Sequence, residues 1–392
     1  MRTGTLRSET PQTAEDAAEL LRACAADGIA VRFAGGATKP WGHPGAECGV
    51  RLGTGALDTI VEHNRGDLTA VVQAGVSLRA LGETLGAADQ MFALDPPLGA
   101  GDGDGATVGG AIAAGDSGPL RHRYGAARDL VLGVTVALSD GSVAHAGGKV
   151  IKNVAGYDLA KLFSGSFGTL GLITEVAVRL HPRPPAHATA TGATDDPARL
   201  QAAALALAAS SLEAQSLDVR WEAGEGSVLA RFAGIAAAEQ AASADRLLAE
   251  AGVQAQTVDH DEALWTAQRA AQRGAARSEG AVVRVSGRPT QLAEACVVAE
   301  VAGATLVGRA ALGLWWIALP AAAPGELVQA IARLRDVLGP SPCVVLDAPS
   351  PVRAHLDPWG QPESPALVLM RRVKARFDPT ATCNPGIFVG GI

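Results

Sequence analysis

Glycine is concentrated in the first half of this 392-residue chain. Residues 1–185 hold 30 of the 47 glycines, and the remaining 207 residues hold the other 17. Glycine permits backbone conformations and close backbone approaches that a Cβ atom would prevent. The first part of the chain is therefore predicted to bring bare backbone close to a large ligand or to another segment.

Composition excludes several classes of protein. With 48% hydrophobic and 19% charged residues the chain is not a disordered one, and a net charge of -7 argues against a nucleic-acid surface. Five widely spaced cysteines form no CxxC pair, so we expect no metal site and no iron–sulfur cluster in this chain. The odd cysteine number fits a reducing compartment. The longest uncharged apolar stretch, residues 310–325, is shorter than the ~20 residues of a membrane span, so a cytoplasmic location is expected.

The hydrophobic pattern predicts an α+β protein with three parts. Residues 1–185 alternate short helices and strands, with a capping box at Thr13 and Asp16 and a hairpin turn at Asp140-Gly141. A linker rich in Pro, Thr and Ala, 181–197, is predicted to end this domain. Residues 186–347 contain two helix–strand–strand sets, which predict an antiparallel sheet covered on one face by helices. Residues 348–392 are predicted to return to the first domain.

The first glycine loop, Phe33 to Gly42, directly follows a predicted strand. Gly35 and Gly36 allow successive N–H groups to point into one concavity, which binds phosphate oxygens without a cationic side chain. The Thr38 hydroxyl offers a further donor. The alternative interpretation is an ordinary turn after the strand. The loop matches neither GxGxxG nor the Walker A motif, so the nucleotide folds that carry those motifs are not indicated.

Two further glycine-rich segments follow. Residues 98–115 include GATVGGAIAA, whose small apolar residues favour tight backbone packing over the alternative of a flexible linker. Asp102 and Asp104 in this segment do not continue into the EF-hand pattern, because no glutamate follows at the required spacing. Residues 147–174 again cluster small residues before a predicted strand, after the sequence KNVAGYDLAKLF.

The order and spacing of these three segments resemble the PCMH-type FAD-binding fold of the vanillyl-alcohol oxidase superfamily. The resemblance covers about residues 8–185 and a shorter motif from Phe377 to Gly386. It implies a two-subdomain FAD-binding domain and an antiparallel-sheet cap domain. Within the superfamily, KNVAGYDL followed by GSFGTLG is similar to the bacterial glycolate oxidase and D-lactate dehydrogenase branch, and above all to the smaller flavin-domain subunit of glycolate oxidase.

The resemblance implies cofactor contacts for matched residues. Backbone amides of the first loop would bind the pyrophosphate: Gly35, Gly36, Ala37, Thr38 and Lys39. Residues of the second segment would line the pyrophosphate and ribityl chain: Thr107, Gly109, Gly110 and Ser117. Residues of the third segment would border the isoalloxazine and adenine ends: Gly165, Gly168, Thr169, Gly171 and Ile173. Asn384 in the returning tail would close the site near the ring.

Two departures from the family pattern bear on the chemistry. Covalent members carry a histidine in or near the first loop, where Thr38 and Lys39 stand here, so non-covalent FAD is expected. The hydroxy-acid enzymes of the branch use a histidine pair with a carboxylate in the second domain. Here His187, His260 and His355 show no HxH spacing, which argues against substrate oxidation by this chain alone.

No catalytic residue is assigned by the sequence, and three are weak candidates. His122 is either a base near the flavin or a residue of a basic turn. Lys152 would stabilise negative charge on the flavin electrostatically. Tyr157 either orients substrate or belongs to the start of a helix.

The resemblance therefore implies an FAD-binding subunit of a glycolate-oxidising complex that passes electrons from a small 2-hydroxy acid to an iron–sulfur partner. The expected partners are a larger homologous flavoprotein subunit and an iron–sulfur subunit, with peripheral membrane association through the complex left open. The alternatives are a stand-alone D-lactate-type dehydrogenase and a non-catalytic assembly or electron-relay subunit.

Overall fold

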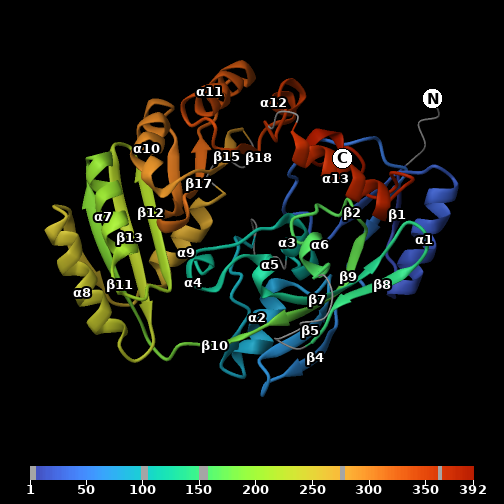
Figure 1. The fold of residues 1–392 in the computed structure, drawn as a ribbon, viewed down its shortest axis with the longest axis horizontal. Coiled ribbons are helices and arrows are strands. Elements are labelled where there is room, and N and C mark those ends of the chain that lie inside the picture. The colour runs from blue at the N-terminus through green and yellow to red at the C-terminus, as the bar shows by residue number, and fades with distance from the viewer. Residues whose placement is uncertain (1–5, 99–104, 150–157, 274–278, 361–363) are drawn as a thin grey trace. The chain divides into compact units, whose positions relative to one another are not determined.

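The structure, a computed structural model, describes residues 6–98, 105–149, 158–273, 279–360 and 364–392 (Figure 1). Contacts divide the described residues into two units. Unit 1 contains those of 1–117, 124–183 and 361–392, and unit 2 contains 118–123 and those of 184–360. The sequence pattern placed these divisions at residues 185 and 347. The chain also crosses briefly into unit 2 at residues 118–123.

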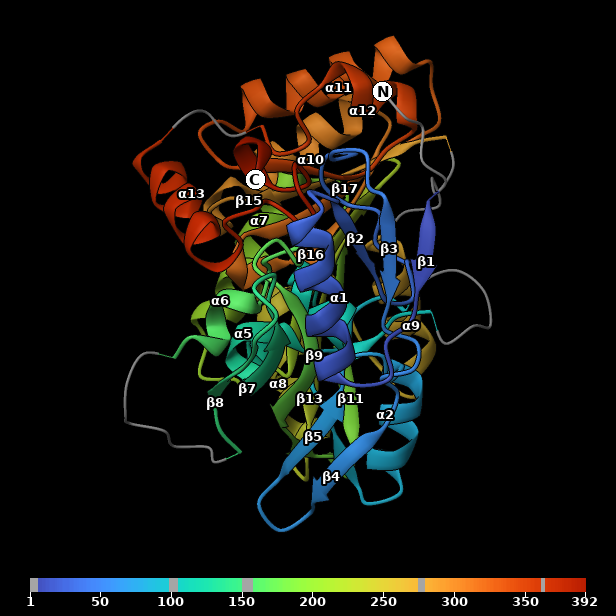
Figure 2. The ribbon, with the colours of Figure 1, turned by 90° about the vertical axis from the view of Figure 1, so that its right-hand side faces the viewer.

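The first subdomain of unit 1 is a three-stranded parallel sheet with the order β1 (Arg7–Glu9), β3 (Val50–Gly53), β2 (Val31–Ala34). Figure 2 shows these strands side by side, with helix α1 (Ala14–Ala26) beside them. The predicted capping box of α1 is confirmed, because Asp16 N donates to Thr13 Oγ1 at 3.0 Å and Thr13 N donates to Asp16 Oδ2 at 3.1 Å. Leu21 and other buried residues of α1 form one core with β2 and β3.

The second subdomain is built on a five-stranded antiparallel sheet. Its order is β4 (Ile60–Asn64), β5 (Thr69–Gln73), β9 (Leu172–Arg179), β7 (Val131–Ala137) and β8 (Val143–Gly147). Four short helices of unit 1 belong to this part: α2 (Leu78–Gly86), α3 (Val108–Ala114), α5 (Ala127–Leu130) and α6 (Ala160–Phe163). Two two-residue strands, β6 (Gln90–Met91) and β10 (His181–Pro182), pair with each other. The predicted hairpin turn between β7 and β8 is confirmed, and Gly141 takes a φ of 89° there.

Unit 2 is one eight-stranded antiparallel sheet. The strands, in spatial order, are β14 (Gln254–Val258), β11 (His187–Thr194), β13 (Glu225–Ala233), β12 (Ser216–Glu222), β16 (Thr305–Arg309), β17 (Leu314–Leu319), β15 (Ala281–Ser286) and β18 (Cys343–Asp347). Four helices pack against one face of it (Figure 1): α7 (Pro197–Ala209), α8 (Ala237–Glu250), α10 (Leu292–Val301) and α11 (Pro324–Val337). The prediction of an antiparallel sheet covered by helices is confirmed.

The other face of this sheet carries polar side chains and helix α9 (Glu262–Ala271). On β11, Ala188 and Ala190 enter the helix-covered core, so Thr189 between them points to the opposite face. There the indole N–H of Trp265, from α9, donates to Thr189 Oγ1 at 2.9 Å. The sequence pattern did not predict α9, because its buried face is made by a few polar and aromatic residues rather than an apolar stripe.

The predicted linker 181–197 is wrong in its central part. Residues His187–Thr194 form β11, which pairs with β13 on one side and β14 on the other. Alanine and threonine alternate in HATATGAT, as they do in strands built from small residues. The segment has few large hydrophobic residues, and for that reason it was predicted to be part of a linker. A Cβ on Gly192 would lie 2.6 Å from Val253 Cγ2, so the small residues also allow close packing of α8 and its following turn.

The chain end returns to the first sheet. Helices α12 (Ser350–His355) and α13 (Pro365–Phe377) precede a tail that runs along β2. Val31 N donates to Thr382 O at 2.8 Å, and Asn384 N donates to Val31 O at 2.9 Å. None of the helices within the described residues is long and apolar enough to cross a membrane.

A buried ion pair holds this tail in place. The ammonium group of Lys374, on α13, donates to Asp378 Oδ2 at 2.5 Å, to Thr169 O at 2.7 Å and to Cys383 O at 2.9 Å. Asp378 in turn accepts the backbone N–H groups of Thr382 and Cys383. One charged cluster therefore joins α13, the tail and the loop that precedes β9.

Asp378→Ala is expected to lower the free energy of unfolding by about 3 kcal/mol, because it leaves the Lys374 ammonium buried without a counter-charge. Urea denaturation followed by circular dichroism measures the loss. Glu9→Ala, which breaks the exposed Arg7–Glu9 pair in the same unit, is the control and should cost less than about 1 kcal/mol. Equal losses in the two variants would contradict a special role for the buried pair.

Candidate functional site

The loop after β2 presents bare backbone. Gly35, Gly36 and Ala37 are exposed, and Ala37 has a φ of 52°. Their three backbone N–H groups make no hydrogen bond to another described residue. Successive N–H donors of this kind after a strand suit an anion.

The same loop touches the start of the second glycine segment. A Cβ on Gly36 would lie 1.2 Å from Gly105 O, and a Cβ on Gly35 would lie 2.4 Å from Thr107 Oγ1. A Cβ on Gly105 would in turn meet Thr38 Cγ2 at 2.8 Å. The structure thus brings the first and second predicted loops together, and glycine is required on both sides of the contact.

Helix α3 follows at once. Thr107 is its N-cap, and its hydroxyl accepts the N–H of Gly110 at 3.2 Å. The N–H groups of Val108 and Gly109 donate to Val76 O and Ala74 O, each at 2.9 Å. A Cβ on Gly109 would lie 2.5 Å from Ala74 Cβ, so this glycine permits close packing of α3 on the segment after β5.

Lys39 and Ser117 meet through a residue that sequence analysis missed. The Lys39 ammonium lies 3.6 Å from Asp116 Oδ2, and both side chains are buried. Asp116 Oδ1 also accepts the N–H of Ser117 at 2.9 Å. The one sequence feature that could have indicated Asp116 is its position directly after Gly115, which ends α3 with a φ of 64°. Lys39 therefore fixes the first loop to the end of α3 rather than extending its charge into solvent.

The third glycine segment covers the other end of α3. Gly165 N donates to Ile112 O and Phe167 N donates to Ala113 O, both at 2.9 Å. Phe167 and Gly168 take φ values of 56° and 70°. The first loop and the third loop thus both contact α3 or the residues at its ends.

Asn384 clamps two of these elements to the returning tail. Its side-chain Oδ1 accepts the N–H of Phe33 at 2.8 Å, and its Nδ2 donates to Phe167 O at 2.7 Å. A Cβ on Gly168 would lie 2.7 Å from Nδ2, so the glycine allows the amide to reach this position. Asn384 is predicted from the sequence as a residue that closes the site. The structure gives it a positioning contact with β2 and the third loop.

The remaining predicted residues lie just before β9 or at its start. Thr169 Oγ1 donates to Ser166 O at 2.7 Å, and a Cβ on Gly171 would lie 2.9 Å from Ala137 O. The side chain of Ile173 belongs to the core of the five-stranded sheet. Their cofactor contacts remain predictions.

Of the three catalytic candidates, His122 is the one that lies within the described residues. Lys152 and Tyr157 lie outside the described residues. His122 lies in the short helix α4 (Arg121–Tyr124) and belongs to the part of the chain grouped with unit 2. Burial, together with the neighbouring Arg123 guanidinium, lowers the pKa of His122, so the ring is neutral near pH 7.

A second buried charge cluster anchors the start of this segment. Arg309 on β16 donates to Gly118 O at 3.0 Å and to Asp218 Oδ2 at 2.8 Å, and its guanidinium lies 4.8 Å from the ring of Trp316. Arg309 and Asp218 are fully buried, and burial raises the pKa of Asp218. The anchor therefore holds the first residue of the 118–123 segment within unit 2. No local sequence pattern indicates it, because its members are far apart in the chain.

No cluster of three or more histidine, cysteine, aspartate or glutamate side chains suited to a metal ion occurs within residues 6–98, 105–149, 158–273, 279–360 and 364–392.

Acidification is expected to destabilise the protein between about pH 7 and pH 5. The unfolded chain binds a proton on His122 near its ordinary pKa of about 6.5, whereas the folded protein binds it only at lower pH. Stability therefore rises with pH in this range. His122→Gln should flatten the dependence by at most about 1.4 kcal/mol per pH unit, measured by urea denaturation at a series of pH values. An unchanged slope in that variant would contradict the assignment.

Comparison with known proteins agrees with this site. A family model described as an FAD binding domain matches residues 9–147. Over 177 residues the chain is 36% identical to glycolate oxidase subunit GlcE of Escherichia coli K12, which covers 44% of this chain and 50% of that protein. It is 35% identical over 175 residues to the mitochondrial D-lactate dehydrogenase [cytochrome] of Arabidopsis thaliana, which covers 44% of this chain and 30% of that protein.

A solved structure of alkyldihydroxyacetonephosphate synthase shares the fold. It matches with a TM-score of 0.73 at 15% identity over 96% of this chain and 75% of that one. The chain spans half or less of the length of the curated relatives that it matches. Residues 9–147 are therefore similar to FAD binding domains, and the chain shares about a third of its residues with each relative over the matched segments.

Proposed function

We propose that this chain is the FAD-binding subunit of a complex that oxidises glycolate or a closely similar 2-hydroxy acid. The observation that carries the proposal is the exposed loop Gly35–Ala37, whose three backbone N–H groups make no hydrogen bond to another described residue. A diphosphate supplies the acceptors that such donors lack.

The residues of unit 1 fit FAD. Gly35 and Gly36 leave no room for a side chain, because Gly105 and Thr107 lie directly against them. At the start of α3, Gly110 is exposed, whereas Thr107, Val108 and Gly109 are buried. We infer that the first loop holds the pyrophosphate, that Thr107, Gly109, Gly110 and Ser117 line the adjoining chain, and that the loop from Gly165 to Gly171 borders the rings.

When bound, FAD supplies an acceptor for the hydride removed from a CH–OH group. The contribution of this chain is to position the cofactor. The Lys39–Asp116 pair fixes the first loop to the end of α3, and Asn384 ties β2 to the loop that contains Phe167. These contacts hold the two loops against their neighbouring elements, which favours binding by limiting the ordering that it requires.

The partner subunits are proposed on similarity to glycolate oxidase subunit GlcE. A stand-alone D-lactate-type dehydrogenase is the second candidate. It is favoured by 35% identity to a D-lactate dehydrogenase over nearly the same number of residues. Similarity of this extent to both relatives does not separate the two candidates, so the distinction lies in substrate turnover.

Gly36→Ala is expected to abolish flavin retention. The added Cβ would overlap Gly105 O and force the two loops apart, so at least about 100-fold weaker FAD binding is expected, which is about 2.7 kcal/mol. The absorbance of the purified protein and titration of the apoprotein with FAD measure the effect. Acid precipitation should release the flavin from the wild type, as expected for non-covalent FAD.

Gly82→Ala is the matched control, because a Cβ at this position in α2 meets nothing within 4 Å. This variant should retain flavin and be slightly more stable. Retention of FAD by Gly36→Ala, with the wild-type affinity, would refute the assignment of the first loop.

Glycolate oxidation is expected to require partner subunits. The chain expressed alone should contain flavin yet reduce an artificial electron acceptor with glycolate at least about 100-fold more slowly than the co-purified complex. D-lactate is assayed in parallel. Full turnover of D-lactate by the lone chain would establish the stand-alone dehydrogenase instead.

A further inference from the structure

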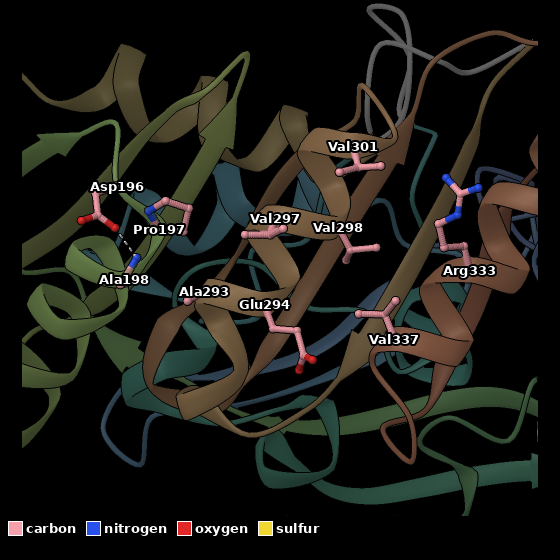
Figure 3. Close-up of a pocket in the computed structure, with 10 residues that line it drawn as sticks. All are labelled: Asp196, Pro197, Ala198, Ala293, Glu294, Val297, Val298, Val301, Arg333 and Val337. Carbon is pink, nitrogen blue, oxygen red and sulfur yellow. Dashed lines mark hydrogen bonds between the residues drawn. The ribbon is translucent and has the colours of Figure 1, made fainter.

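The outer surface of unit 2 carries an apolar groove between helices α10 and α11 (Figure 3). It has a volume of about 600 Å³ and is lined by Asp196, Pro197, Ala198, Ala293, Glu294, Val297, Val298, Val301, Arg333 and Val337. A smaller hollow of about 140 Å³ shares Val298 and Arg333 with it and continues along α11. The groove lies on the helix layer, on the side of α10 and α11 that faces away from the sheet.

Helix α10 carries two valines on its outer side, alongside the exposed Glu294 and Glu300. Leu292, Cys296 and Ala299 pack into the core of unit 2. Val297 and Val301, one turn apart on the outer side, are 51% and 65% exposed. Covering these apolar side chains with another surface removes them from water, which is favourable. Valine is also a poor helix former at an exposed position, so helix propensity does not account for these residues.

Charges of both signs flank the apolar centre of the groove. In Figure 3, Glu294 and Arg333 lie on opposite sides of the pair Val298 and Val337. Both charged side chains are exposed, and neither has an ion-pair partner among the described residues. A partner surface that carries only positive or only negative charge would be repelled by either Arg333 or Glu294. A second copy of the groove, related by a two-fold rotation, places its Arg333 opposite Glu294 and its Glu294 opposite Arg333.

We propose that this groove is the surface through which two copies of the chain associate about a two-fold axis near Val298 and Val337. In this arrangement Val297 and Val301 lie in the apolar centre, and Glu294 of each copy faces Arg333 of the other. The proposal goes beyond cofactor binding, and it is tested on protein with or without flavin.

Sedimentation velocity from about 1 µM to about 100 µM should show a reversible dimer of the purified chain. Val297→Asp should weaken dimerisation at least about tenfold, because it places a carboxylate in the apolar centre. Flavin content and circular dichroism should be unchanged. A wild-type chain that stays monomeric over the whole concentration range would overturn the proposal. This holds also if a different protein binds the groove.

Charge reversal tests the two-fold geometry. Glu294→Arg and Arg333→Glu should each weaken dimerisation at least about tenfold, because each places like charges opposite one another at two sites. An equimolar mixture of the two variants should dimerise again, since every facing pair is then of opposite sign. The double variant should also dimerise.

Glu250→Arg and Arg246→Glu on α8 make the same changes of net charge at exposed positions away from the groove. They should dimerise like the wild type. Failure of the mixture to restore the dimer, or an equal loss in the α8 variants, would overturn the proposed arrangement.

Discussion

The contact between two glycine-bearing loops is the constraint on which the first unit depends. Gly36 lies so close to Gly105 that a Cβ would reach within 1.2 Å of the carbonyl oxygen. This approach sets the first loop beside the N-terminus of α3 and leaves its N–H groups exposed. A side chain at either position would separate the loops and remove the concavity. The proposed cofactor site therefore rests on absent side chains rather than on a charged residue.

Buried polar contacts fix the elements around this approach. Lys39 pairs with Asp116, Asn384 joins β2 to the loop at Phe167, and Lys374 joins α13 to the loop at Thr169. Two of these three clusters involve the last residues of the chain. The tail is thus part of the first unit, although nearly two hundred residues separate it from β9. An unpaired member of any cluster would leave a buried polar group without a partner, which is costly.

The sheet of unit 2 has two different faces. One is an apolar core under four helices, and the other carries the clusters of Arg309 with Asp218 and Arg231 with Asp261. Arg309 also holds the carbonyl of Gly118, the residue after Ser117. Outside the apolar core, α10 presents valines where a solvent-exposed helix normally carries charged residues. The apolar face therefore contributes stability, and the polar face anchors the 118–123 segment. The outer surface of the helices is the one proposed for association.

Local patterns determined much of this protein. Turn glycines, the Thr13–Asp16 capping box and the periodicity of the long helices predicted the α+β class and most elements, because each depends on residues close in sequence. The FAD-binding domain was implied by the resemblance of the three glycine-rich segments to a known family. Only the tertiary structure decided the rest. The segment His187–Thr194 is a strand because it pairs with β13 and β14, and its small residues alone do not predict this. Asp116, Arg309 and the clamp made by Asn384 act through partners that the fold brings together from distant parts of the chain, and no spacing within one segment records such contacts.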